Sequence, residues 1–142
     1  VRAWGGRGAH AGAGPAQTPL LAGRTTGGSS GGNAAALAAG LGDTGIGTET
    51  GCSIRLPASC CGIVGFKPGW GRVPVDGVYP LCRSFDTVGP MATSVTEVAT
   101  MWPILAAAPL PAPLLDGLTA GLVTPPTPAG GPAQAGNRAG QA

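Results

Sequence analysis

Residues 27–68 read GGSSGGNAAALAAGLGDTGIGTETGCSIRLPASCCGIVGFKP, and this stretch contains most of the structural signals in the chain. Residues 31–39 are predicted to form a helix, because alanine and leucine have high helix propensities and Gly40 and Gly42 follow as a stop signal. Residues 44–50 are predicted to form a short buried strand or an extended loop. A small-residue helix and an extended segment therefore separate the serines at 29 and 30 from the serine at 53.

The second half of the stretch predicts further short elements. Residues 53–61 should open a short helix, since Pro57 is tolerated near a first helical turn. Residues 63–66 are apolar and predict a brief strand. Residues 70–80 contain several glycines and prolines and predict a turn-rich connection.

A longer helix is predicted further along, at residues 94–107. Ser94 or Thr93 can cap its first turn, and Glu97 is placed to complete a capping box. Pro103 should kink or shorten this helix. One apolar face at helical spacing is expected from Val95, Val98, Met101, Trp102 and Leu105.

The composition predicts that only part of the 142 residues folds into a core. The chain has 27 glycines and 15 prolines, only 4% aromatic and 10% charged residues, and an apolar fraction rich in alanine. Such a chain buries little apolar area for each residue, so we expect a small core. Residues 21–108 are predicted to be the folded part, residues 1–20 to be irregular and of low complexity, and residues 109–142 to be a disordered tail rich in proline, glycine and alanine.

The charges and cysteines exclude several classes of function. A net charge of +2, with seven arginines spread along the chain, gives no basic patch for nucleic acid. No apolar run reaches the ~18 residues of a membrane span, and no secretory signal is visible. Cysteines without a disulfide framework lead us to expect a cytoplasmic protein. The four cysteines include no C-x-x-C pair and there is one histidine, so neither a metal site nor a disulfide framework is predicted. The absence of an initiator methionine suggests a chain that begins within a longer protein.

Two short motifs are better explained by structure than by function. Residues 27–31, GGSSG, fit the G-x-S-x-G elbow of α/β-hydrolases, but that chemistry needs a histidine later in the chain and none follows Ser29. Residues 40–45, GLGDTG, fit the G-x-G-x-x-G dinucleotide fingerprint, but a helix precedes them where a strand is required. We therefore interpret these glycines as a helix stop and a turn.

The two serine sites together are more specific than either one alone. A serine hydroxyl attacks a carbonyl only when a nearby base removes its proton, and flanking glycines let backbone N–H groups approach a developing oxyanion. Ser53 lies in ETGCSIRLP, at a predicted strand-to-helix turn where the helix dipole favours negative charge. Turn glycines with capping serines are the alternative explanation for each site taken singly. The order and spacing of both sites, followed by GIVGFKP, favour catalysis.

These motifs resemble the amidase signature family, hydrolases that use two serines and a lysine. The resemblance covers residues 24–107, through RTTGGSSGGNAAALAAG, IGTETGCSIRLPASCCGIVGFKP and GRVPVDGVYPLCRSFDTVGPMATSVTEVA. It implies an α/β fold, here a fragment of a mixed β-sheet flanked by helices. It also implies that Ser53 is the acyl-forming nucleophile and that Ser29, on a cis peptide after Gly28, relays the proton. The implied oxyanion hole consists of the backbone N–H groups of Thr50, Gly51, Cys52 and Ser53.

The chain departs from the family pattern at the general base. In the family this base is a lysine upstream of the glycine-serine stretch, whereas the one lysine here, Lys67, matches a structural position downstream. Cys52 stands where the family usually has glycine, so its side chain is expected to crowd the oxyanion hole or to alter its dihedral angles. Arg55 matches arginines that bind a substrate carboxylate in some members. The alternative for Arg55 is a structural pair with an acid such as Asp86.

The resemblance implies an amidohydrolase fragment that acts on a carboxamide C–N bond through a seryl ester in the intact parent. No cofactor or metal is expected. The implied partners are a small amide substrate and, in the parent, a second copy or the other subunits of an amidotransferase, since one subunit of glutamyl-tRNA amidotransferase, its A-type chain, belongs to this family. Without the catalytic lysine, the chain alone is expected to be inactive. The alternative is a catalytically dead structural or interaction fragment, or a truncated gene product.

Overall fold

The computed structural model describes residues 9–10 and 14–109. The predicted tail, residues 109–142, therefore lies outside the described residues apart from Pro109. The elements in chain order are β1 (Ala9–His10), β2 (Gly14–Pro15), α1 (Gly31–Ala38), β3 (Thr44–Glu49), α2 (Arg55–Cys61), β4 (Val64–Gly65), β5 (Thr87–Ala92) and α3 (Val95–Ala106). The helices predicted within 31–39, 53–61 and 94–107 are thus confirmed, as are the strands predicted within 44–50 and 63–66.

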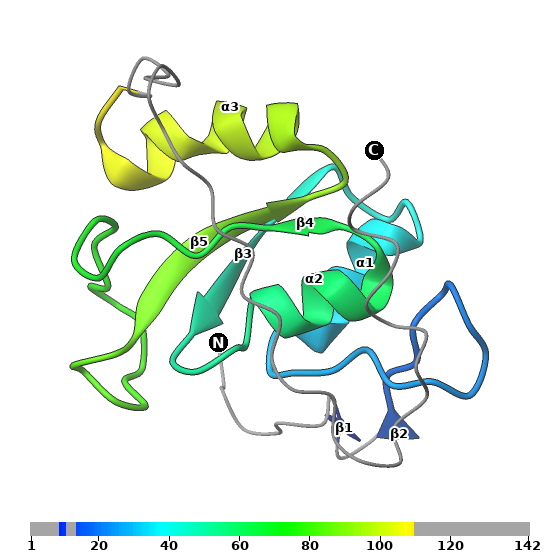
Figure 1. The fold of residues 1–142 in the computed structure, drawn as a ribbon. Coiled ribbons are helices and arrows are strands. Elements are labelled where there is room, and N and C mark those ends of the chain that lie inside the picture. The colour runs from blue at the N-terminus through cyan, green and yellow to red at the C-terminus, as the bar shows by residue number, and fades with distance from the viewer. Residues whose placement is uncertain (1–8, 11–13, 110–142) are drawn as a thin grey trace, which may run out of the picture. The chain divides into compact units, whose positions relative to one another are not determined.

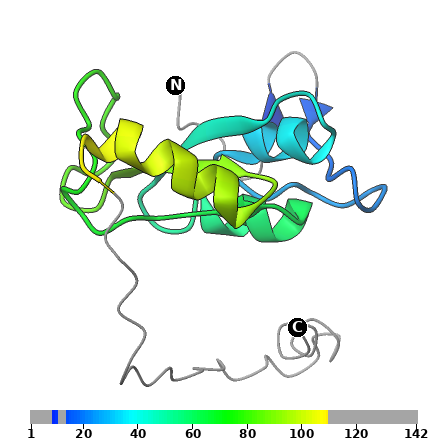
Figure 2. The same ribbon diagram turned by 90° about the horizontal axis from the view of Figure 1, so that it is seen from above.

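A three-stranded sheet organises the described residues, with helices on both faces. Its strand order is β3–β5–β4, and both pairs are antiparallel, from Thr44 opposite Ala92 to Glu49 opposite Thr87 in the longer pair. Helices α1 and α2 lie on one face of the sheet and α3 lies on the other (Figures 1 and 2). The α/β class predicted from the sequence is therefore confirmed.

The core lies between the sheet and the α1–α2 pair, and it is small, as the composition predicts. Its buried members are Ala34, Leu37, Ile54, Ala58, Cys61 and Met91. Glycines on the facing strands allow this close packing. A Cβ atom at Gly47 would lie 2.9 Å from side-chain atoms of both Ile54 and Met91. On the opposite face, the rings of Phe66 and Trp102 pack edge to face with centroids 5.4 Å apart and so join α3 to the end of β4.

The central strand β5 is an element that the sequence did not predict. All six of its residues are buried, although Gly89 and Pro90 argue against a central strand because proline has no N–H to donate. The chain accommodates Pro90 by using its carbonyl oxygen, which accepts the N–H of Phe66 at 3.0 Å. A sheet position that needs only an acceptor can therefore hold a proline.

Helix α3 has the predicted capping box but differs from prediction at two positions. Ser94 Oγ accepts the N–H of Glu97 at 3.2 Å, and the Glu97 carboxylate accepts the N–H of Ser94 at 2.9 Å. Pro103 does not shorten the helix, which continues to Ala106 and ends where Ala107 adopts φ 48°. Val95, the first residue of the helix, is exposed rather than part of the apolar face. No helix among residues 9–10 and 14–109 has the length and apolar character required to cross a bilayer.

Part of the segment predicted to be irregular, residues 1–20, has regular backbone pairing. β1 and β2 form a two-stranded antiparallel ribbon, and an isolated bridge joins Gln17 to Thr25. Thr18 within this region is buried. This bridge brings the chain into the glycine-serine stretch that begins at Gly27.

Candidate active site

The two serine sites are brought together by a backbone hydrogen bond. The N–H of Ser30 donates to the carbonyl oxygen of Ser53 at 3.1 Å, although 23 positions separate the two residues in the sequence. The peptide bond between Gly28 and Ser29 is cis. Ser29, Ser30 and Ser53 are all partly buried. The fold thus places the two predicted catalytic serines on adjoining loops.

Ser30 also fixes the start of α1 against strand β3. Its Oγ lies 3.4 Å from both the N–H and the carbonyl oxygen of Thr48. Asn33, in the first turn of α1, also contacts β3, since its Nδ2 donates to the carbonyl oxygen of Ile46 at 3.2 Å. These side chains occupy backbone groups on the outer edge of β3, so α1 and β3 hold the first serine site in a fixed position.

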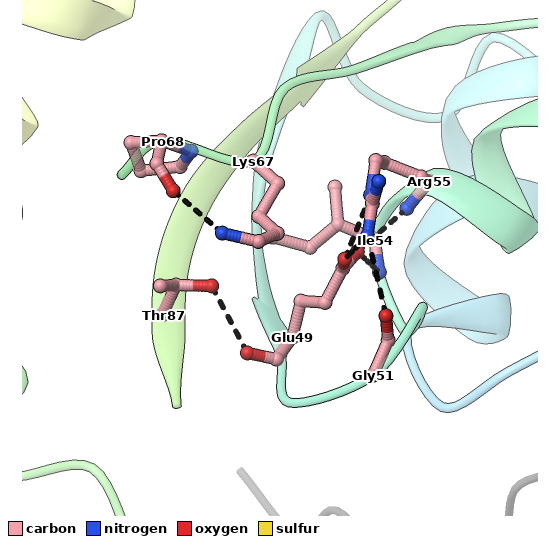
Figure 3. Close-up of polar contacts among 7 residues, drawn as sticks. All are labelled: Glu49, Gly51, Ile54, Arg55, Lys67, Pro68 and Thr87. Atoms are coloured by element: carbon pink, nitrogen blue, oxygen red, sulfur yellow. Dashed lines mark hydrogen bonds and ion pairs between the residues drawn. The ribbon is translucent and has the colours of Figure 1, made fainter. Parts of the chain in front are cut away.

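Ser53 lies in a turn, residues 50–53, that a buried carboxylate holds in place. Glu49 is only 1% exposed, and its Oε2 accepts the N–H groups of Ile54 at 2.9 Å and Arg55 at 3.0 Å. Its Oε1 accepts from Arg55 Nε at 2.8 Å and forms an ion pair with Arg55 Nη2 at 2.6 Å. Figure 3 shows this cluster, in which Arg55 also reaches the carbonyl oxygen of Gly51 at 3.2 Å. The two ends of the 50–53 turn are therefore joined through one side chain.

Glu49 replaces the missing side-chain cap of α2. The N-cap residue of this helix, Ile54, has no side-chain oxygen to accept a first-turn N–H. The Glu49 carboxylate accepts those N–H groups from the end of β3 instead, where the positive end of the helix dipole also favours it. Burial alone would raise the pKa of Glu49, but the hydrogen bonds from the Arg55 side chain and the two backbone N–H groups outweigh it and hold the pKa below its ordinary value.

The partner of Arg55 differs from the one that the sequence suggested. The structural ion pair with an acid is confirmed, but the choice of Asp86 is wrong, because the acid is Glu49 at the end of β3. The hydrogen bond and charge of Glu49 raise the pKa of Arg55. Its side chain remains 56% exposed. Recognition of a substrate carboxylate by Arg55 stays a prediction.

Asp86 has a different role, which sequence reasoning missed. Its Oδ1 accepts the hydroxyl of Thr50 at 2.5 Å, and its two oxygens accept the N–H groups of Leu81 and Cys82 at 2.9–3.0 Å. Partial burial would raise the pKa of Asp86, but the Thr50 hydroxyl and the Cys82 and Leu81 N–H groups lower it overall. The sequence feature that could have drawn attention to Glu49 and Asp86 is the rarity of carboxylates, since the chain has only six acidic residues.

The structure also defines the surroundings of the one lysine and the four cysteines. Lys67 Nζ donates to the carbonyl oxygen of its neighbour Pro68 at 2.8 Å (Figure 3). Cys52 is exposed, and Cys61 is buried in the core, where burial raises its pKa. All four cysteines are free thiols. The described part of the chain contains no group of three residues suited to hold a metal ion.

Comparisons with known proteins show which family the chain belongs to. The family model for amidases matches residues 3–107. The chain is 51% identical over 86 residues to the A-type chain of the glutamyl-tRNA(Gln) amidotransferase from Methanothermobacter thermautotrophicus, an alignment covering 61% of this chain and 19% of the relative. It is 43% identical over 115 residues to AtzE, a subunit of 1-carboxybiuret hydrolase from Pseudomonas sp. strain ADP, covering 81% of this chain and 24% of the relative.

The fold matches a solved structure as well. A crystal structure described as an amidase superposes with a TM-score of 0.73 at 45% identity, covering 77% of this chain and 25% of that one. This chain thus spans about a fifth to a quarter of the length of the relatives it matches. The family match over residues 3–107 and the agreement in structure show that the chain belongs to the amidase signature family.

Proposed function

We propose that this chain carries the nucleophile and the oxyanion hole of an amidohydrolase that cleaves a carboxamide C–N bond. The observation that supports this most directly is the hydrogen bond from the Ser30 N–H to the Ser53 carbonyl oxygen, which joins the two serine loops. In the proposed reaction, Ser53 Oγ bonds to the amide carbon and its proton passes through Ser29 to the base and on to the leaving amine. Water then hydrolyses the seryl ester to release the acid.

The 50–53 turn supplies the proposed oxyanion hole. Three carbonyl oxygens of this turn each accept a hydrogen bond from within the chain: Gly51 from Arg55 Nη2, Cys52 from the N–H of Leu56, and Ser53 from the N–H of Ser30. In contrast, among the residues that the structure describes, the N–H groups of the turn make no hydrogen bond. Donors that are held in place and free of acceptors are what a developing oxyanion requires.

In this proposal the general base comes from the part of the larger fold that lies outside this chain. The chain spans 19–25% of the relatives it matches. Lys67 is the only lysine of the 142 residues, and its Nζ is already bonded to the carbonyl oxygen of Pro68. Because this bond holds its Nζ within the chain, the half-buried Lys67 is a structural residue in this proposal.

The A-type chain of a tRNA amidotransferase is a second candidate within the family. The relatives that are about 50% identical support it, since several carry that name. A chain of this kind would work with partner subunits on an amide substrate. A catalytically inert fragment is the candidate from another class, and the bonded state of Lys67 favours it for the chain in isolation.

A chimera separates these possibilities. Residues 14–108 would replace the matching segment of AtzE, and hydrolysis of 1-carboxybiuret and labelling by a serine-reactive fluorophosphonate would be measured. We expect an active chimera that loses both signals in the Ser53→Ala variant, whereas Ser59→Ala, at an exposed position of α2, retains them. The isolated chain should label weakly or not at all. Labelling that persists after Ser53→Ala would contradict the assignment of the nucleophile.

A further inference from the structure

The segment of residues 70–85, between β4 and β5, borders two hollows. One hollow touches the turn itself and is lined in part by Thr50, Tyr79, Leu81 and Asp86. The other, with a volume of about 240 Å³, is lined by Trp70, Val75, Val78, Pro80, Arg83 and Asp86. Asp86 is thus common to both hollows, together with Val75 and Val78.

Few hydrogen bonds within the 70–85 segment stabilise its conformation, and most of them involve residues near its C-terminal end. Trp70 Nε1 donates to the carbonyl oxygen of Arg83 at 3.0 Å. The N–H groups of Phe85 and Asp86 both donate to the carbonyl oxygen of Cys82, at 2.9 and 2.8 Å. The Asp86 carboxylate then closes the same turn by accepting the N–H groups of Leu81 and Cys82.

One contact connects this closed turn to the 50–53 turn. β3 and β5 pair until Glu49 lies opposite Thr87, and the Thr87 hydroxyl donates to the Glu49 carbonyl oxygen at 3.0 Å. The next residues beyond this pair are Thr50 and Asp86, so the strand register places their side chains opposite each other. The Thr50 hydroxyl donates to Asp86 Oδ1 at 2.5 Å. This side-chain hydrogen bond therefore extends the pairing of β3 and β5 by one residue on each strand.

We propose that Asp86 is a positioning residue that fastens the 70–85 segment to the 50–53 turn through Thr50, so that the segment forms a fixed wall of the substrate site. The fastening of the two loops is independent of the proposed function. Only the identification of the wall as part of a substrate site rests on it. A charged acceptor that binds a hydroxyl and two N–H groups at once is stronger than a neutral one, and it holds both loops in one geometry. A substrate group resting against the wall would thereby be aligned with the proposed oxyanion hole.

The test uses the full chain and NMR resonances of backbone amides, followed while the pH is lowered. Protonation of Asp86 weakens its bonds to Thr50, Leu81 and Cys82 together. We therefore expect the amides of Leu81 and Cys82 and those of the 50–53 turn to shift with one common midpoint. That midpoint should lie below the ordinary aspartate pKa, as the hydrogen bonds to the carboxylate imply.

Other ionisable groups near Asp86 must be separated from it. Arg83, Cys82 and Tyr79 lie on the same segment, and the positive charge of Arg83 is one of the causes that lower the pKa of Asp86. Glu49 also titrates at acid pH, and because its carboxylate holds the 50–53 turn through Ile54 and Arg55, the amides of the turn report its midpoint as well. Repeating the titration in Glu49→Gln removes that contribution.

Two substitutions of Thr50 decide the outcome. Thr50→Val keeps the shape of the side chain and removes the hydroxyl, so the response of the 50–53 turn to the Asp86 midpoint should be lost while that of Leu81 and Cys82 remains. Thr50→Ser retains a hydroxyl and should restore the response. A turn that never shares the midpoint in the unsubstituted chain, or that keeps it in Thr50→Val, would overturn the proposal. Since no catalysis is measured, this result is independent of the labelling of Ser53.

Discussion

The Nη2 of Arg55 lies 2.6 Å from Oε1 of Glu49, and this ion pair spans the turn that carries Ser53. The carboxylate of Glu49 is buried and the guanidinium of Arg55 is largely exposed. The buried negative charge of Glu49 therefore requires a partner, whereas Arg55 can be solvated by water. The pair therefore matters more for the shape of the 50–53 turn than for a general gain in stability, since half-exposed pairs contribute little.

Glu49→Gln should destabilise the chain by about 1–3 kcal/mol, because the introduced amide N–H₂ faces N–H donors of Ile54 and Arg55 in a buried site. Urea denaturation measures this change. Asp43→Asn is the matched control, since Asp43 is exposed and precedes β3. Equal denaturation midpoints for Glu49→Gln and the unsubstituted chain would show that the carboxylate does not hold the turn.

Stability should fall in acid through the same carboxylates. Hydrogen bonds outweigh burial and lower the pKa of Glu49 and of Asp86 in the folded chain. As the pH falls, the unfolded chain therefore binds protons first. The free energy of unfolding should be largest above about pH 5 and decline as the pH drops through the folded-state pKa values. Urea midpoints between about pH 3 and pH 7 measure this slope, and Glu49→Gln should reduce it. A slope that is the same in that variant would assign the acid sensitivity to other groups.

Two glycine substitutions should have opposite effects. A Cβ atom at Gly89 would overlap the backbone carbonyl oxygen of Phe66, which cannot rotate away, so Gly89→Ala should cost about 2 kcal/mol or more. Gly32 lies exposed in α1 with no atom near its Cβ position, so Gly32→Ala should stabilise the chain by about 0.5–1 kcal/mol. Thermal unfolding of the pair measures both changes, and a tolerated Gly89→Ala would show that β4 and β5 pack less closely.

Ser94→Ala should destabilise α3 by about 1 kcal/mol, because it removes the acceptor of the Glu97 N–H from the capping box. The control is Thr96→Ala, at an exposed position one residue before Glu97. Chemical denaturation compares the two variants. If both cost the same, the effect belongs to the loss of a hydroxyl in general and not to the cap.

Lys67→Met should leave the activity of the chimera within about tenfold, since loss of a true general base typically costs 10²–10⁴-fold. The reason is the existing bond from Lys67 Nζ to the carbonyl oxygen of Pro68, which gives the lysine a local structural role. The rate of 1-carboxybiuret hydrolysis measures the change beside Ser53→Ala. A loss as large as that of Ser53→Ala would make Lys67 the base and contradict the assignment above.

Local signals in the chain were enough to predict most of the elements. Alanine-rich residues before Gly40 predicted α1, and the pattern of Ser94 and Glu97 predicted the capping box of α3. These predictions succeed because propensity and capping depend on residues a few positions apart. The motifs around Ser29 and Ser53 likewise predicted the family, which the comparisons confirmed.

The partners across the fold could not be obtained in this way. Strand β5 contains Gly89 and Pro90 and is central only because β3 and β4 pair with it on both sides. Asp86, which the sequence suggested as a partner of Arg55, instead accepts the hydroxyl of Thr50, because β3 and β5 end side by side although 36 positions separate the two residues. Such choices depend on contacts between residues up to 58 positions apart, such as Asn33 with Met91, and only the packed chain brings these residues within reach of one another.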